Sequence, residues 1–142
     1  MRRPVQGRLG HPMVYILLNL MPILAAAALG LSIDAAHHLL VGWGAKPPSR
    51  GLIVLAALAQ FWLASILAGA LILAPDKASP WIMAVGSAVV IWAGFVLPVL
   101  AVTLSYRGLE PRVVIADVVH WLIVMVAQAV LMKSWGLVPP PG

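Results

Sequence analysis

The run from Val113 to Lys133 reads VVIADVVHWLIVMVAQAVLMK, an apolar stretch that contains an acid, a histidine and a glutamine. It is long enough to cross a bilayer as a helix. At about 100° per residue, Asp117 and Gln128 project only about 20° apart, and His120 lies about 60° from Asp117. Because a charged group facing hydrocarbon is costly, we expect this polar face to point toward other helices or water.

The composition of the chain is typical of an integral membrane protein. Of its 142 residues 63% are hydrophobic and only 9% are charged, whereas a soluble domain has about a quarter of its residues charged. The net charge of +5 does not indicate nucleic-acid binding, because the basic residues lie at the N-terminus and in short connections, where membrane proteins carry topology signals. With no cysteine, disulfides, thiolate metal sites and cysteine nucleophiles are excluded.

The apolar runs predict a single membrane domain of four helical spans. We place them at residues 13–40, 51–74, 81–104 and 113–134. The short connections require antiparallel neighbours, so the fold class is an all-α, integral membrane four-helix bundle with up-down connections. The tail at residues 136–142, GLVPPPG, is expected to be a loose, non-helical end.

The N-terminal segment suggests an orientation. Arg2, Arg3 and Arg8 precede the first span without any acid, which favours both termini inside, in a bacterial inner membrane. A basic segment before an apolar run also fits a secretory signal, cleaved near Ala28-Leu29-Gly30. The length of the run and the polar residues that follow it in helical register favour an uncleaved helix.

Small and polar residues mark candidate helix contacts. Asn19 and Gly30 share a face of the first span with Asp34 and His37. Gly94 lies in the third span. Small residues let neighbouring backbones approach, and polar ones form hydrogen bonds across the contact. Pro22 is interpreted as an ordinary tolerated proline within a membrane helix.

The segment from Ile91 to Trp135 also resembles a known family. The resemblance rests on Trp92, Gly94, Phe95, Pro98, Arg112, Ile115, Asp117, His120, Leu131 and Trp135. In these residues the chain is similar to the membrane-protein family called domain of unknown function 1761. The resemblance implies a small multi-span membrane protein and assigns no activity.

Two acids are followed by a histidine three positions later. These pairs are Asp34 with His37, followed by His38, and Asp117 with His120. The spacing puts both members of a pair on one helix face. One pair ends the first span and the other begins the fourth, so an antiparallel bundle brings both to the same side of the membrane. We therefore expect a polar intramembrane cluster of Asp34, His37, His38, Asp117, His120 and Gln128 near one face.

Several interpretations of this cluster stay open. The carboxylates can act as structural glue by bonding their own histidines or a neighbouring helix. The cluster can line a pathway for protons or a small solute, since histidine titrates near neutrality. Metal binding by Asp34, His37, Asp117 and His120, or a haem between two histidines, is the remaining possibility.

The sequence contains no phosphate-binding loop and no nucleophile–base arrangement, so no catalytic residue is assigned. The favoured interpretation is a non-enzymatic protein of the lipid bilayer with no cofactor. It would be an accessory subunit or a small proton-linked carrier, working as a homo-oligomer or within a larger membrane complex. The alternative is a metal- or haem-dependent membrane enzyme that uses the same residues.

Overall fold

The structure is a computed structural model that describes residues 13–42 and 46–140. Within these residues every regular element is helical. The elements are α1 (Val14–Leu18), α2 (Leu20–Val41), α3 (Arg50–Leu73), α4 (Pro80–Ile91), the π-helical segment η1 (Trp92–Val96), α5 (Leu97–Tyr106) and α6 (Pro111–Trp135). Four helical segments are long and apolar enough to cross a membrane: α2, α3, α4 through α5, and α6. The predicted class, a membrane four-helix bundle, is confirmed.

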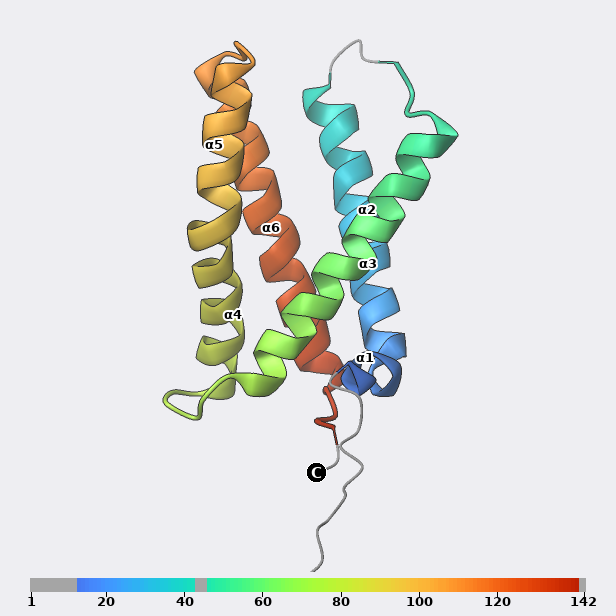
Figure 1. The fold of residues 1–142 in the computed structure, drawn as a ribbon, viewed down its shortest axis with the longest axis vertical. Coiled ribbons are helices and arrows are strands. Elements are labelled where there is room, and N and C mark those ends of the chain that lie inside the picture. Colours follow the sequence, from blue (N-terminus) through green and yellow to red (C-terminus); the bar gives the residue numbers. More distant parts are fainter. Residues whose placement is uncertain (1–12, 43–45, 141–142) are drawn as a thin grey trace, which may run out of the picture.

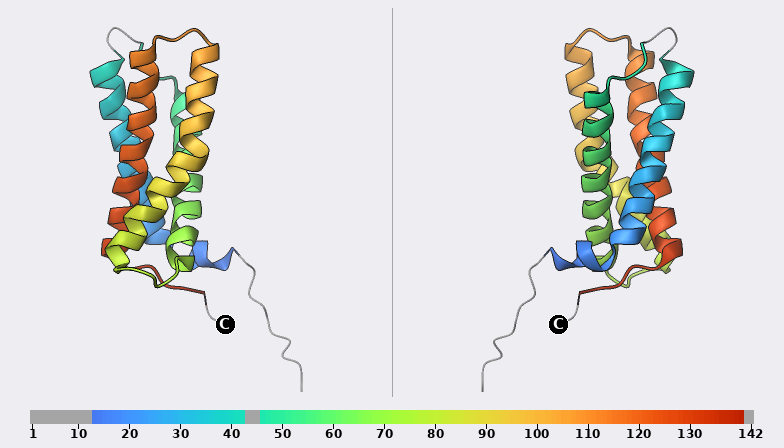
Figure 2. Two further views of the ribbon diagram at one scale, coloured as in Figure 1. Left: turned by 90° about the vertical axis from the view of Figure 1, so that its left-hand side faces the viewer. Right: turned by 90° about the vertical axis from the view of Figure 1, so that its right-hand side faces the viewer.

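Successive spans run in opposite directions, with α6 at the centre of the bundle (Figure 1). Helix α6 packs against α2, α3, α4 and α5. One end of the bundle carries the α3–α4 turn, α1 and the residues that follow α6, and we call it the α3–α4 end. The opposite end, where α2 ends and α6 begins, is the α5–α6 end. Figure 2 shows α1 projecting sideways at the α3–α4 end.

The first span is shorter than the sequence predicts, and its starting residue is corrected. The helix breaks at Asn19, so the span begins at Leu20 rather than at residue 13. Pro22 explains the break, because it has no N–H for the Leu18 carbonyl and its ring opposes a continuous helix there. It sits in the first turn of α2, where a missing N–H is harmless. Pro22 therefore ends one helix and starts another.

A second proline shapes the third span. The Leu97 N–H donates to the carbonyl of Trp92, five residues back, just before Pro98, which has no N–H. This π-helical bonding lets the helix continue past the proline. Gly94 lies in η1 on an exposed face, and a Cβ added there would meet nothing within 4 Å. The expectation that Gly94 lies at a helix contact is not met within this chain.

Side chains of the apolar core gather where α2, α3, α4 and α6 meet. The core is made of Ile23, Ala26, Ala64, Leu67, Ala68, Ala88, Met125, Ala129 and Met132, all fully buried. Many large apolar side chains point outward instead, as in Leu73 and Val90. Outward apolar surface of this extent suits contact with lipid.

Asn19 joins the break before α2 to the residues after α6. Its Nδ2 donates to the Val138 carbonyl at 2.8 Å, and its Oδ1 accepts the Val138 N–H at 2.6 Å. Asn19 is almost completely buried. The predicted helix contact at Asn19 is thus a contact with the tail. The tail is non-helical through Pro140, but the expectation of a loose end is wrong at Val138, because both of its backbone groups are bonded.

Candidate functional site

The two acid–histidine pairs lie together at the α5–α6 end. Asp34 and His37 belong to the last two turns of α2, and Asp117 and His120 to the first turns of α6. The end of α2 and the start of α6 lie at the same end of the bundle (Figure 1), so the antiparallel arrangement brings these two parts of the helices to one level.

The pairs are crossed between the helices. His37 Nε2 lies 2.9 Å from Asp117 Oδ1, and His120 Nε2 lies 2.7 Å from Asp34 Oδ1. Each carboxylate on one helix therefore contacts the histidine of the other, and not the histidine three residues along its own helix. We call these four residues the crossed cluster.

The two imidazole rings of the crossed cluster stack on each other. Their centroids are 4.2 Å apart and their planes differ by 22°. The edge of the Trp121 ring approaches His120, with centroids 5.3 Å apart and planes at 72°. The stack fixes both rings in orientation, so each Nε2 faces its carboxylate.

A chain of amides continues from the crossed cluster into the middle of the bundle. Gln60 Nε2 on α3 donates to Asp34 Oδ2 at 2.8 Å. Gln128 Nε2 donates to Gln60 Oε1 at 2.9 Å and to the Ala26 carbonyl at 3.1 Å. Gly30 makes this approach possible, because a Cβ there would lie 2.6 Å from Gln128 Nε2 and even closer to the Gln60 amide. The predicted helix contact at Gly30 is present.

Burial increases along this chain. The side chain of Asp117 is 32% exposed and that of Asp34 25%, whereas His120 is 7% exposed and both glutamines are fully buried. Gln128 Oε1 is buried with no hydrogen-bond partner among the described residues. From Gln128 toward the α3–α4 end the interior is mainly the apolar core, and the buried side chains of Ser65 and Asn19 are hydrogen-bonded to backbone carbonyls there. The polar chain thus opens at one end of the bundle and stops inside it.

No fixed positive charge balances the two carboxylates. Among the described residues, the ion pairs of Asp34 and Asp117 are those with the two histidines, and the only other one joins Arg112 to Glu110 at the surface. Two carboxylates with two neutral imidazoles carry a net charge of −2. Only protons on the crossed cluster, or an added cation, can bring this charge toward zero.

Two residues, His38 and Gln60, differ from the cluster that the sequence predicts. His38 lies one turn beyond Asp34 but outside the crossed cluster, and its side chain has no hydrogen-bond partner within the described part of the chain. The expectation that His38 belongs to the cluster is therefore corrected. His38 instead lines a groove between α2 and α3. Gln60 was absent from the expected cluster, although a single glutamine in an apolar span is the kind of signal that indicates a buried contact.

The four candidate metal ligands are arranged as two ion pairs. Within the described ranges no three His, Cys, Asp or Glu side chains are grouped to hold a metal ion. Both Nε2 atoms are directed at carboxylates, and rings stacked at 4.2 Å leave no space for a macrocycle between them. The candidate metal ligands Asp34, His37, Asp117 and His120 are therefore brought together as two ion pairs and not as a ligand set.

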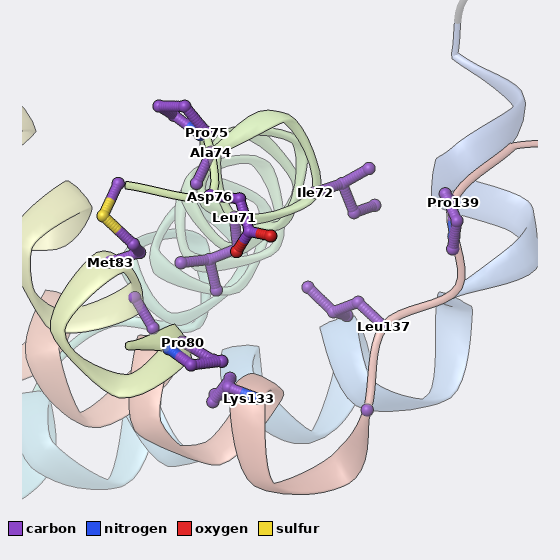
Figure 3. Close-up of a pocket in the computed structure, with 12 residues that line it drawn as sticks. Leu71, Ile72, Ala74, Pro75, Asp76, Pro80, Met83, Lys133, Leu137 and Pro139 are labelled. Atoms are coloured by element: carbon purple, nitrogen blue, oxygen red, sulfur yellow. The ribbon is translucent and has the colours of Figure 1, made fainter. Parts of the chain in front are cut away.

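A pocket that contains an acid and a base lies at the α3–α4 end of the bundle. It has a volume of about 330 Å³ and is lined by Asp76 from the α3–α4 turn, Lys133 from α6, and apolar residues that include Leu137 of the tail (Figure 3). None of its lining residues belongs to the crossed cluster or to the amide chain. The pocket is therefore separate from the candidate site.

Comparisons of the chain with protein-family models, with curated proteins and with solved structures find no match. The resemblance to domain of unknown function 1761 stays a prediction.

Proposed function

We propose that this chain is a non-enzymatic membrane protein whose crossed cluster takes up and releases protons at one face of the membrane. The observation that carries the proposal is the charge balance of Asp34, His37, Asp117 and His120, which have no lysine or arginine partner in the described part of the chain. A buried group of this kind is sensitive to its proton content, and histidine is the side chain that changes charge near neutral pH.

The extent of the polar chain supports a subunit rather than a carrier acting alone. The hydrogen-bonded side chains lead from the α5–α6 end to Gln128 and meet the apolar core there. Among the described residues no hydrogen bond continues this chain from Gln128 toward the other face, and the buried Ser65 hydroxyl donates to the Phe61 carbonyl of its own helix instead. We therefore favour an accessory subunit of a homo-oligomer or larger membrane complex, in which the crossed cluster reports or buffers proton availability.

The proposed location is a bacterial inner membrane, with the α3–α4 end toward the cytoplasm. Support comes from Arg2, Arg3 and Arg8 before the first span, since basic residues favour the inner side. In this orientation the crossed cluster exchanges protons with the outer face.

Histidine NMR on the protein in lipid nanodiscs tests the proposal directly. With ¹⁵N-labelled histidine and His11→Gln and His38→Gln background substitutions, the two remaining histidines are followed from pH 5 to 8. We expect the signals of both histidines to respond to pH, and we expect Asp34→Asn to change the signal of His120 more than that of His37. Asp117→Asn should have the larger effect on His37, because Asp117 is the carboxylate that His37 contacts.

Two results would contradict the proposal. If neither histidine changes protonation over this range, the crossed cluster is a fixed structural contact. If both carboxylate substitutions affect the two histidines equally, the crossed pairing is not the arrangement that controls the protons.

A further inference from the structure

A groove between α2 and α3 shares a carboxylate with the crossed cluster. It has a volume of about 560 Å³ and is lined by Leu31, Asp34, Ala35, His38, Leu39, Pro48, Leu52, Ile53 and Ala56. This volume is in the range of sites for small organic molecules. Asp34 is the only residue that lines the groove and also belongs to the crossed cluster.

Most side chains that line the groove are apolar, and its rim carries apolar side chains that are exposed at the surface of α2 and α3. Leu39 is 78% exposed, Leu52 52% and Ile53 50%, so these side chains border the groove from the outer surface of α2 and α3. A ligand that is dissolved in the bilayer can enter between them without crossing a polar barrier. This favours an apolar ligand body over a fully hydrated solute.

The polar side of the groove favours positive charge. The described residues that line it include one carboxylate, Asp34, and one imidazole, His38, but no lysine or arginine. Both Asp34 oxygens already accept one hydrogen bond each, from His120 and Gln60, yet a carboxylate has about four acceptor sites. An organic cation in the groove would lie against a carboxylate with unused acceptor sites, and attraction between opposite charges is stronger away from bulk water.

We propose that the groove binds a lipophilic organic monocation, and that the cation takes the place of one proton of the crossed cluster. This inference rests on the proposed proton-linked function. The titratable groups around Asp34 are His120 from α6 and His37 and His38 from its own helix, while α3 contributes the neutral Gln60 amide. When the cation neutralises Asp34, the proton on His120 loses its stabilising charge and leaves toward water at the α5–α6 end. The exchange keeps the net charge unchanged.

The inference is tested by comparing the binding of two ions that have nearly identical size and shape but opposite charge. Tetraphenylphosphonium and tetraphenylborate are titrated separately into the purified full chain in uncharged detergent. We expect saturable binding of the phosphonium, and its release of about one proton per bound cation in weakly buffered solution at a pH where the histidines are protonated. Tetraphenylborate should bind at least about tenfold more weakly. Equal binding of the two ions, or cation binding without proton release, would overturn the inference.

Matched substitutions locate the site. Asp34→Asn should weaken phosphonium binding about tenfold or more, while Asp76→Asn, which removes a carboxylate at the opposite end of the bundle, should leave it unchanged. Because Asp34→Asn also alters the crossed cluster, Ala56→Leu provides an independent variant that narrows the groove from α3. Its control is Ala59→Leu on the same helix, at an exposed position that does not line the groove. Unchanged binding in both Asp34→Asn and Ala56→Leu would show that the cation binds elsewhere.

The inference and the proposed function fail separately. Histidine signals that do not titrate remove the proton-linked function. If the histidines titrate but no Asp34-dependent cation binding is found, the function stands and the groove assignment is wrong.

Discussion

The two halves of the contact between α2 and α6 are built in opposite ways. Toward the α5–α6 end, the helices meet through crossed ion pairs with specific partners. Toward the α3–α4 end, Ile23 and Ala26 of α2 share an apolar core with Ala129 and Met132 of α6. Apolar packing tolerates small shifts of one helix along another, whereas the crossed pairs form only when both helices are in one register. The polar half therefore sets the register that the apolar half stabilises.

The largest effect is expected where the two halves join, at Gly30. Gly30→Val introduces a Cβ into the space of the Gln60–Gln128 amide pair, so the helices must separate or the amides must lose their hydrogen bonds. We expect a loss of about 3 kcal/mol in unfolding free energy, from overpacking and unsatisfied amides together. Denaturation by SDS, followed by circular dichroism, measures it.

The control for this variant is Gly86→Val in α4, where an added Cβ meets nothing within 4 Å. Similar stability of the two variants would mean that the amide chain is not tightly packed at Gly30.

An intermediate effect is expected from a double-mutant cycle across the crossed cluster. Asp34→Asn combined with His120→Gln should show a coupling energy of about 1–3 kcal/mol, because these side chains are 2.7 Å apart. Asp34→Asn combined with His37→Gln should show a smaller one, since His37 contacts Asp117. The same denaturation assay supplies all the values. A larger coupling within α2 than between α2 and α6 would refute the crossing.

The smallest effect is expected in the apolar half, at the contact between Asn19 and the tail. Asn19→Ala removes both hydrogen bonds to Val138, and we expect a loss of about 1 kcal/mol. Amide hydrogen exchange at Val138 should accelerate strongly, which mass spectrometry detects. Ser32→Ala, which removes an exposed hydrogen bond within α2, serves as the control and should leave the exchange at Val138 unchanged. Slow exchange in the Asn19 variant would show that the tail is held by other contacts.

The sequence predicted the number and direction of the spans because long apolar runs have few alternatives in a bilayer. It did not predict the crossing, since three-residue spacing satisfies a pair within one helix as well as a pair between helices. Val118 shows a similar limit. An apolar residue away from the polar face is expected to contact lipid. Val118 is buried instead, and its carbonyl accepts the Trp92 Nε1–H at 2.9 Å. Such choices depend on which helices become neighbours, and apolar composition alone does not specify neighbours.

The crossed pairing also orders the events of membrane insertion. Asp34 and His37 are made early in synthesis, but their partners lie 86 and 80 residues further along the chain. Gln60 arrives sooner, 26 residues after Asp34, and satisfies only one carboxylate oxygen. Until α6 is made, the first span holds an acid and a histidine that lipid does not solvate. Helix α2 thus depends on α6, far along the chain, to settle in the bilayer, and a chain interrupted between them leaves the polar groups of α2 without partners.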